Sequence, residues 1–216
     1  MFIETIKILD GKIYNINWHN QRFNKTRLKF FGLDKDIKLQ EYIYPPSPIG
    51  LFRCRIIYGY DIISIEYIPY IFSKKLTFKI VQSDIEYSYK YSNRDKLNQL
   101  KDSANGYDEI IIEKNGLLTD TSIANIAFFD GDNWITPKTP LLGGTTRARL
   151  INQNFLIPKN INSDNLKHFY NFALMNAMIG FQIQKNITID INKKRKYAFR
   201  QTTTTTISRD YARTYI

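Results

Sequence analysis

The pattern of apolar residues in the first third of the chain has a period of two, which favours β-strands over helices. Residues 2–8 alternate in this way, Gly11 marks a turn, and residues 13–16 alternate again. Residues 53–58 and 62–67 are predicted to form a second hairpin around a short turn. We therefore expect this region to consist mostly of β-structure.

One segment of the same region has helical periodicity instead. A helix is predicted over residues 18–31, and Gly32 is expected to end it as a glycine cap. The residues predicted to share one stripe of this helix are Trp18, Arg22, Thr26 and Lys29.

The rest of the chain mixes short helices and strands. Helices are predicted at residues 95–104, 147–154 and 163–172. Strands are predicted at residues 76–81, 109–113, 123–129, 134–136 and 181–191. Asn115 and Gly116 predict a tight hairpin turn. The sum is an α+β fold with segregated helices.

Two lobes and a tail are expected from this order of elements. Residues 1–82 would form a small N-terminal α/β lobe, and residues 83–192 a larger C-terminal lobe. Residues 193–216 begin with a basic cluster, continue into a threonine run and show no apolar periodicity. They are expected to be a disordered or loosely packed tail.

Composition narrows the class of protein. The 216 residues are 43% hydrophobic, which is enough for a sizeable core, and they contain no apolar run of about eighteen residues that would predict a membrane span. The single cysteine, Cys54, cannot form an internal disulfide, and a cytoplasmic protein is expected. The net charge of +11 is spread along the chain, so nucleic acid is not the expected partner, and anionic small ligands suit this charge equally well. No metal site is predicted.

One segment suggests an anion site on physical grounds. Gly143 and Gly144 are followed by Thr145 and Thr146 and then by a predicted helix. Backbone N–H groups, two hydroxyls and a positive helix end could together bind a phosphate or carboxylate. The segment lacks the lysine and the spacing of a nucleotide-binding P-loop. A plain loop with a helix cap is the alternative interpretation.

The order of several short motifs resembles the class IV aminotransferases, the family of branched-chain and D-amino-acid aminotransferases and 4-amino-4-deoxychorismate lyase. The motifs are residues 90–94 (Lys-Tyr-Ser-Asn-Arg), residues 116–120 (Gly-Leu-Leu-Thr-Asp) with Asn125, Thr136-Pro137, residues 144–147 (Gly-Thr-Thr-Arg) and residues 176–180 (Asn-Ala-Met-Ile-Gly). The resemblance runs from about residue 2 to 190. It implies a two-lobed fold-type IV pyridoxal-phosphate enzyme, similar to D-amino-acid aminotransferase, with a shortened N-terminal lobe.

The resemblance also implies roles for individual residues. Lys90 would carry pyridoxal 5'-phosphate as a Schiff base, and a desolvated position would lower its pKa. Asp120 would face the ring nitrogen of the cofactor, where the family normally has Glu. Arg22 would clamp the phosphate with charge-assisted bonds, completed by Gly144, Thr145 and Thr146. For Lys90 the alternative is an ordinary surface lysine, and for Asp120 it is a turn-forming residue.

Three further residues are candidates for substrate contact or for support of the site. Arg94 could reach a substrate carboxylate or cap nearby backbone. Asn125 is expected to support the site from below, and Asn176 lies in the late motif. His19 is interpreted as a packing residue or helix-start residue and not as a catalyst.

The expected activity is that of a pyridoxal-phosphate enzyme acting on an amino-bearing carboxylate, and 4-amino-4-deoxychorismate lyase is the first hypothesis. Ala177, where many relatives have a hydroxyl residue, and the short first lobe lean toward the lyase. A branched-chain or D-amino-acid aminotransferase would share every cofactor residue. A non-catalytic binding protein on the same fold is the third alternative. Relatives of this kind are commonly homodimers.

Overall fold

A computed structural model describes residues 1–192 and 195–199 and divides the chain into two compact units. The first unit contains Met1–Ser73 and Tyr87–Arg94, and the second contains Lys74–Glu86 and the described residues from Asp95 onwards. Each unit has its own hydrophobic core. The expected α+β class is confirmed.

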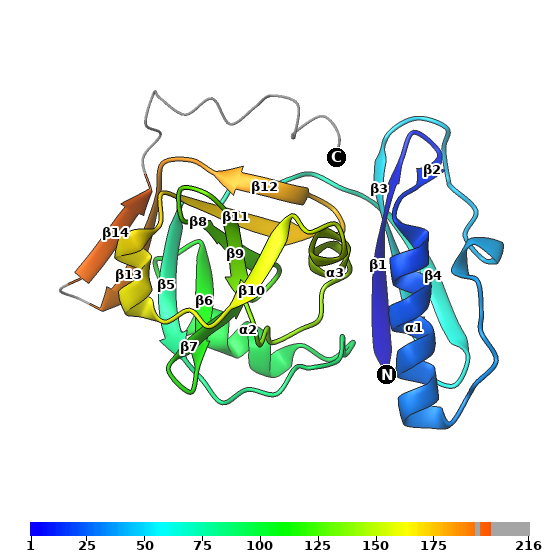
Figure 1. The fold of residues 1–216 in the computed structure, drawn as a ribbon. Coiled ribbons are helices and arrows are strands. Elements are labelled where there is room, and N and C mark those ends of the chain that lie inside the picture. The colour runs from blue at the N-terminus through cyan, green and yellow to red at the C-terminus, as the bar shows by residue number, and fades with distance from the viewer. Residues whose placement is uncertain (193–194, 200–216) are drawn as a thin grey trace. The chain divides into compact units, whose positions relative to one another are not determined.

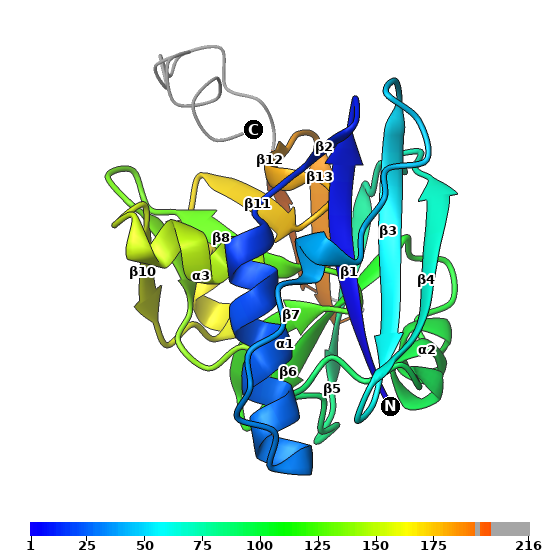
Figure 2. The same ribbon diagram turned by 90° about the vertical axis from the view of Figure 1, so that its right-hand side faces the viewer.

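The first unit is an antiparallel sheet with the strand order β2-β1-β3-β4, covered on one face by helix α1 (Figures 1 and 2). The bounds of these elements are β1 (Phe2–Leu9), β2 (Lys12–Ile13), α1 (Ile16–Phe31), β3 (Leu51–Tyr58) and β4 (Ile62–Pro69), with a short 3-10 turn at Leu39–Glu41. Apolar residues of β1 and β3 pack against Phe23 of α1. Gly32 ends the helix in a left-handed conformation, with φ of 67°, which confirms the predicted cap.

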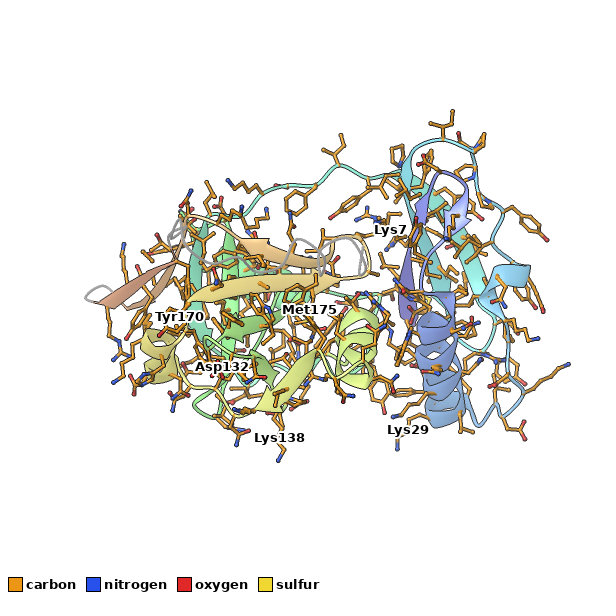
Figure 3. The ribbon with its side chains drawn as sticks, turned by 45° about the horizontal axis from the view of Figure 1, so that its top comes forward. Lys7, Lys29, Asp132, Lys138, Tyr170 and Met175 are labelled. Atoms are coloured by element: carbon orange, nitrogen blue, oxygen red, sulfur yellow. The ribbon has the colours of Figure 1, made fainter. Side chains whose placement is uncertain are left out.

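The stripe of residues predicted for α1 agrees only in part with the face of the helix that is buried. The buried residues of this helix are His19, Phe23, Thr26 and Arg27. Lys29, labelled in Figure 3, is exposed in the last turn, where a positive side chain favours the negative helix end. The helix therefore buries several polar groups against the sheet, and these need partners.

The second unit is built on a ten-stranded sheet with the order β10-β9-β8-β7-β6-β5-β13-β14, in which β11 pairs with both β8 and β12 (Figure 1). Its strands are β5 (Thr77–Gln82), β6 (Glu109–Lys114), β7 (Leu117–Thr121), β8 (Asn125–Phe129), β9 (Trp134–Pro137), β10 (Leu156–Lys159), β11 (Asn171–Asn176), β12 (Gly180–Gln184), β13 (Ile187–Asn192) and β14 (Arg195–Phe199). Its helices are α2 (Asp95–Asp102) and α3 (Thr145–Asn152), with a 3-10 helix at Ser163–His168. Asn115 and Gly116 both have positive φ in the β6–β7 hairpin turn, which confirms the turn prediction.

Helix α3 is held by a cluster of apolar residues on the sheet. Leu150 of α3 packs with Ala173 and Met175 of β11 and with Leu156 of β10. Met175 is labelled in Figure 3. This packing fixes the position of the α3 N-terminus relative to β7 and β8, where the motifs of the second unit lie.

Three local predictions for the second half of the chain need correction. The helix expected at residues 163–172 is a 3-10 helix only to His168, and strand β11 starts at Asn171. The single strand expected at residues 181–191 is two strands, β12 and β13, separated by a turn in which Asn186 has φ of 55°. Within the predicted tail, Arg195–Phe199 form β14 against β13, while residues 193–194 and 200–216 lie outside the described part.

The boundary expected at residue 82 does not coincide with the division into units. Strand β5 pairs in parallel with both β6 and β13, so it belongs to the second unit, and Tyr87–Arg94 then return to the first. Parallel pairing joins segments that are far apart in sequence, which local patterns do not reveal. Among the described residues, no helix is long and apolar enough to cross a membrane.

Candidate active site

Lys90 lies on a short segment that is fixed to the free edge of β1 in the first unit. The backbone N–H of Ile3 donates to the carbonyl oxygen of Lys90 at 2.9 Å, and Tyr91 forms an isolated antiparallel bridge with Phe2. The Ser92 N–H donates to the carbonyl of Met1 at 3.1 Å. Phe2 also packs against the rings of Tyr89 and Tyr91. These contacts hold the lysine backbone in place.

A buried ion cluster lies between β1 and α1 of the same unit. Glu4 is fully buried and accepts hydrogen bonds from Arg22 Nε at 2.8 Å, from Arg22 Nη2 at 2.7 Å and from His19 Nδ1 at 2.7 Å. Burial alone would raise the pKa of Glu4, but the charge and hydrogen bonds of Arg22 and the hydrogen bond of His19 lower this pKa to about 2. Burial lowers the pKa of His19 and outweighs the opposing effect of Glu4, so the imidazole is neutral and donates from Nδ1.

The pKa of the half-buried Lys90 amine is lowered from 10.5 to about 7. Loss of hydration is the largest cause, the positive charges of Arg22 and Arg94 act in the same direction, and Glu4 opposes them. Roughly half of the amines would be neutral near pH 7, which is the state that a nucleophile requires. An ordinary surface lysine would be almost fully protonated at this pH.

Arg94 lies beside Tyr87 at the end of the same segment. The guanidinium carbon of Arg94 is 5.8 Å from the centre of the Tyr87 ring, and the Tyr87 hydroxyl donates to the carbonyl of Tyr91 at 2.7 Å. Tyr87 is buried, and its pKa is raised by burial. The first unit therefore brings together Lys90, Arg22 and Arg94 from the predicted site residues.

In the second unit, Asp120 of β7 is the centre of a hydrogen-bonded group. Its carboxylate is 3% exposed and accepts from Asn125 Nδ2 at 2.7 Å and from the Leu142 N–H at 2.8 Å. Burial raises the pKa of Asp120 from 3.8 to about 6, although these hydrogen bonds and the charge of Arg147 lower it in part. A buried acid without a tight cationic partner is costly to a fold and is typical of functional sites.

Asn125 ties this acid to the loop before α3. Its Nδ2 also donates to the carbonyl of Leu142 at 2.8 Å, so both hydrogens of the amide group are used. A Cβ atom added at Gly144 would lie only 1.9 Å from Asn125 Oδ1. The amide could rotate away only by losing two hydrogen bonds, so position 144 requires glycine.

The N-terminus of α3 follows this glycine directly. Gly144 is the N-cap, provides no side-chain cap, and is followed by the buried Thr145 and Thr146 in the first helical turn. Backbone N–H groups at such a helix start attract anions. Arg147 of the same turn donates from Nη2 to the carbonyl of Pro137 at 2.7 Å, which anchors the turn to β9. The second unit therefore brings together Asp120, Asn125 and residues 144–146.

Asn176 lies at the end of β11, directly after Met175, which pairs with Asn125 of β8. Its Oδ1 accepts from the N–H groups of Met178 at 2.9 Å and Ile179 at 3.1 Å, and its Nδ2 donates to the carbonyl of Ile123 at 3.2 Å. These hydrogen bonds stabilise the β11–β12 turn, so Asn176 supports the local backbone.

We expect Gly144→Ala to destabilise the second unit by about 1–3 kcal/mol, because the new methyl group must displace the Asn125 amide. Gly143→Ala is the matched control, since no described atom lies within 4 Å of a Cβ there, and its effect should stay within about 0.5 kcal/mol. Urea unfolding of both variants measures the difference. Equal stability of the two variants would show that the contact with Asn125 does not contribute to the free energy of unfolding.

Sequence reasoning missed Glu4 as a partner of Arg22. A signal was present, because Glu4 occupies an inward position between Phe2 and Ile6 on a strand that alternates in this way. A charged residue at such a position needs a buried partner. The role expected for His19 agrees with its contact, since it packs in the interior and supports Glu4.

Comparisons with known proteins identify the family. The family model described as amino-transferase class IV matches residues 86–187. An uncharacterised protein from Haemophilus influenzae is 38% identical over 182 residues, covering 82% of this chain and 97% of that protein. A crystal structure from Haemophilus somnus, provisionally assigned as a 4-amino-4-deoxychorismate lyase, is 39% identical, with a TM-score of 0.76 and coverage of 83% of this chain and 96% of that chain.

A hypothetical aminotransferase from Mycobacterium tuberculosis, in its PLP-bound form, extends the likeness in fold. It is 14% identical, with a TM-score of 0.74, and covers 98% of this chain and 86% of that chain. The chain belongs to the class IV aminotransferase family. This is a family of pyridoxal-phosphate-dependent enzymes, so the predictions of the family, of an enzyme and of its cofactor are confirmed at that level.

Proposed function

We propose that the chain is a 4-amino-4-deoxychorismate lyase, which converts its substrate into 4-aminobenzoate and pyruvate. One observation carries this proposal. The chain is 39% identical to the Haemophilus somnus protein that is provisionally assigned to this activity, and the match covers 96% of that protein. Ala177 and the short first unit lean the same way. Folate synthesis in the cytoplasm, by a homodimer, would be the corresponding biological setting.

The residues of both units fit pyridoxal phosphate. Lys90 offers an amine that is neutral in part near pH 7, Asp120 offers a buried carboxylate, and Gly144 lets the Asn125 amide that bonds Asp120 lie where a Cβ would otherwise be. Arg22 in the first unit, and the start of α3 with Thr145 and Thr146 in the second unit, are each proposed as phosphate ligands. When bound, this cofactor supplies an aldehyde for the amine and a ring that withdraws electrons from the substrate's α-carbon.

The chain's own residues would then position groups and move protons. The Lys90 amine, with its pKa near 7, can accept a proton and return it at the same pH, which suits transfer from the α-carbon to the leaving enolpyruvyl group. Asp120, ionised above its pKa of about 6, would keep a proton on the ring nitrogen. Loss of pyruvate makes the product ring aromatic, so positioning matters more than strong acid–base chemistry.

A branched-chain or D-amino-acid aminotransferase is the second candidate, because the family model matched here carries the aminotransferase description. The same residues would serve it, but the proton would return to the cofactor, and turnover would need a keto-acid acceptor.

One assay separates the two. Purified protein with pyridoxal phosphate is given aminodeoxychorismate alone, and pyruvate is measured. The lyase releases pyruvate without any acceptor. Turnover that depends on an added keto acid would overturn the proposal, and absence of both activities and of bound cofactor would favour a binding protein.

A further inference from the structure

Glu4 is a charged residue in an apolar position. It lies on the face of β1 that also carries Phe2, Ile6 and Ile8, all of them buried against α1. An ionised carboxylate in such a place costs several kcal/mol unless it is fully paired. Apolar residues of similar size would satisfy packing alone, so the structure has retained a charge that the fold does not require.

The pairing of Glu4 is geometrically complete. Both carboxylate oxygens receive the fork of Arg22, through Nε to Oε1 and Nη2 to Oε2, and His19 adds a third bond to Oε2. His19 and Arg22 are three residues apart on α1 and therefore share one face of the helix. A bidentate pair of this kind fixes the plane of the guanidinium group.

The same charges act on Lys90. The ionisable groups that influence its amine come from β1 (Glu4), from α1 (Arg22) and from the end of the segment before α2 (Arg94), and Lys90 in turn acts on His19 of α1. The backbone of Lys90 is bonded to Ile3, the residue next to Glu4. Glu4 therefore lies on the strand that holds the Lys90 backbone, and its partner Arg22 lies on the helix that packs against this strand.

We propose that Glu4 is a positioning residue of the Lys90 site, which fixes the orientation of the Arg22 guanidinium and offsets its positive charge within the unit that holds Lys90. The assignment of Lys90 as the reacting amine rests on the proposed function. The coupling between Glu4, Arg22 and Lys90 does not, and it can be measured on the cofactor-free chain.

The test follows the titration of Lys90 by NMR. Isotopically labelled methyl groups are placed on the lysines of the full cofactor-free chain, and the Lys90 signal is identified by its absence in Lys90→Arg. In Glu4→Gln, loss of the negative charge leaves Arg22 unopposed, so the Lys90 midpoint should fall by about one pH unit. In Arg22→Gln the midpoint should rise, and in the double variant it should return close to the wild-type value.

Glu66→Gln is the matched control, because Glu66 pairs with Arg55 at 3.1 Å on the exposed face of the β3–β4 hairpin in the same unit. It should leave the Lys90 midpoint unchanged. If Glu4→Gln does not fold, the double variant is compared with Arg22→Gln, and its midpoint should be lower by about one pH unit.

An unchanged or raised midpoint in the folded Glu4→Gln variant, or equal midpoints in that second comparison, would overturn the inference. A purely structural role of Glu4 would change the unfolding free energy without this pattern of shifts. If the midpoints move as expected but the chain binds no pyridoxal phosphate, the proposed function fails and the coupling stands.

Discussion

Replacement of Lys90 by Ala should lower turnover by at least about 10³-fold, because the same amine is proposed to bind the cofactor and to transfer the proton. Lys90→Arg should be equally inactive. It keeps a positive charge, but a guanidinium neither condenses with an aldehyde nor releases a proton near pH 7. Steady-state assays of pyruvate release measure the effect.

The control for this prediction is Lys29→Ala. Lys29 is an exposed lysine in the same unit, in the last turn of α1 (Figure 3), so its loss should leave turnover within about two-fold of wild type. The far-UV circular dichroism of both variants should match that of the wild type. Full activity in a folded Lys90→Ala variant would remove the residue from the chemistry.

Asp120→Asn should reduce turnover by about 10²-fold or more, because an amide cannot keep a proton on the ring nitrogen of the cofactor. The amide is nearly the same size as the carboxylate, so the loss would not come from packing. Cofactor affinity and turnover, measured separately, distinguish weaker binding from weaker chemistry. Wild-type turnover in this variant would leave Asp120 with only its structural contacts to Asn125 and Leu142.

The pH dependence of stability gives an independent check on Asp120. Its pKa is about 6 in the folded chain and near 3.8 when unfolded, so the folded state binds the proton more tightly. Stability contributed by this group is present below about pH 4 and is lost as the pH rises to 6, by about 3 kcal/mol in total. The unfolding free energy of wild type relative to Asp120→Asn should fall by this amount across that window. A rise would mean that the carboxyl pKa is lowered, not raised.

The loss of stability that Asp120 causes at neutral pH points to a functional role for this residue. A residue that makes the fold less stable at neutral pH is retained only if it contributes something other than stability. The hydrogen bonds from Asn125 and Leu142 reduce the cost without removing it. Glu4 shows the opposite arrangement, because its charge is fully paired and its pKa is lowered to about 2.

Much of the fold could be predicted from local patterns. The β3–β4 hairpin, the Gly32 cap and the Asn115-Gly116 turn each depend on residues close in sequence. Strand β11 could not be predicted in this way, since its pairing with β8 joins residues more than forty positions apart. The buried face of α1 was misjudged for a different reason. Its buried set includes His19, Thr26 and Arg27, and a search for apolar periodicity overlooks polar residues.

The sequence motifs predicted which residues belong to the candidate site, but not how these residues contact their neighbours. The motifs predicted roles for Lys90, Asp120 and Gly144, but they carried no information on the contacts that set the pKa of Lys90 and Asp120. The requirement for glycine at position 144 becomes clear only from the nearby Asn125 amide. Likewise, the pairing of Arg22 with Glu4 depends on α1 packing against β1, which no local pattern describes.

The most direct measurement of the central claim is reductive trapping followed by peptide mapping. The full chain is incubated with pyridoxal 5'-phosphate and reduced with borohydride, and the modified lysine is located by mass spectrometry. We expect a single dominant modification on the peptide that contains Lys90. Modification spread over exposed lysines such as Lys29, with none at Lys90, would contradict the account.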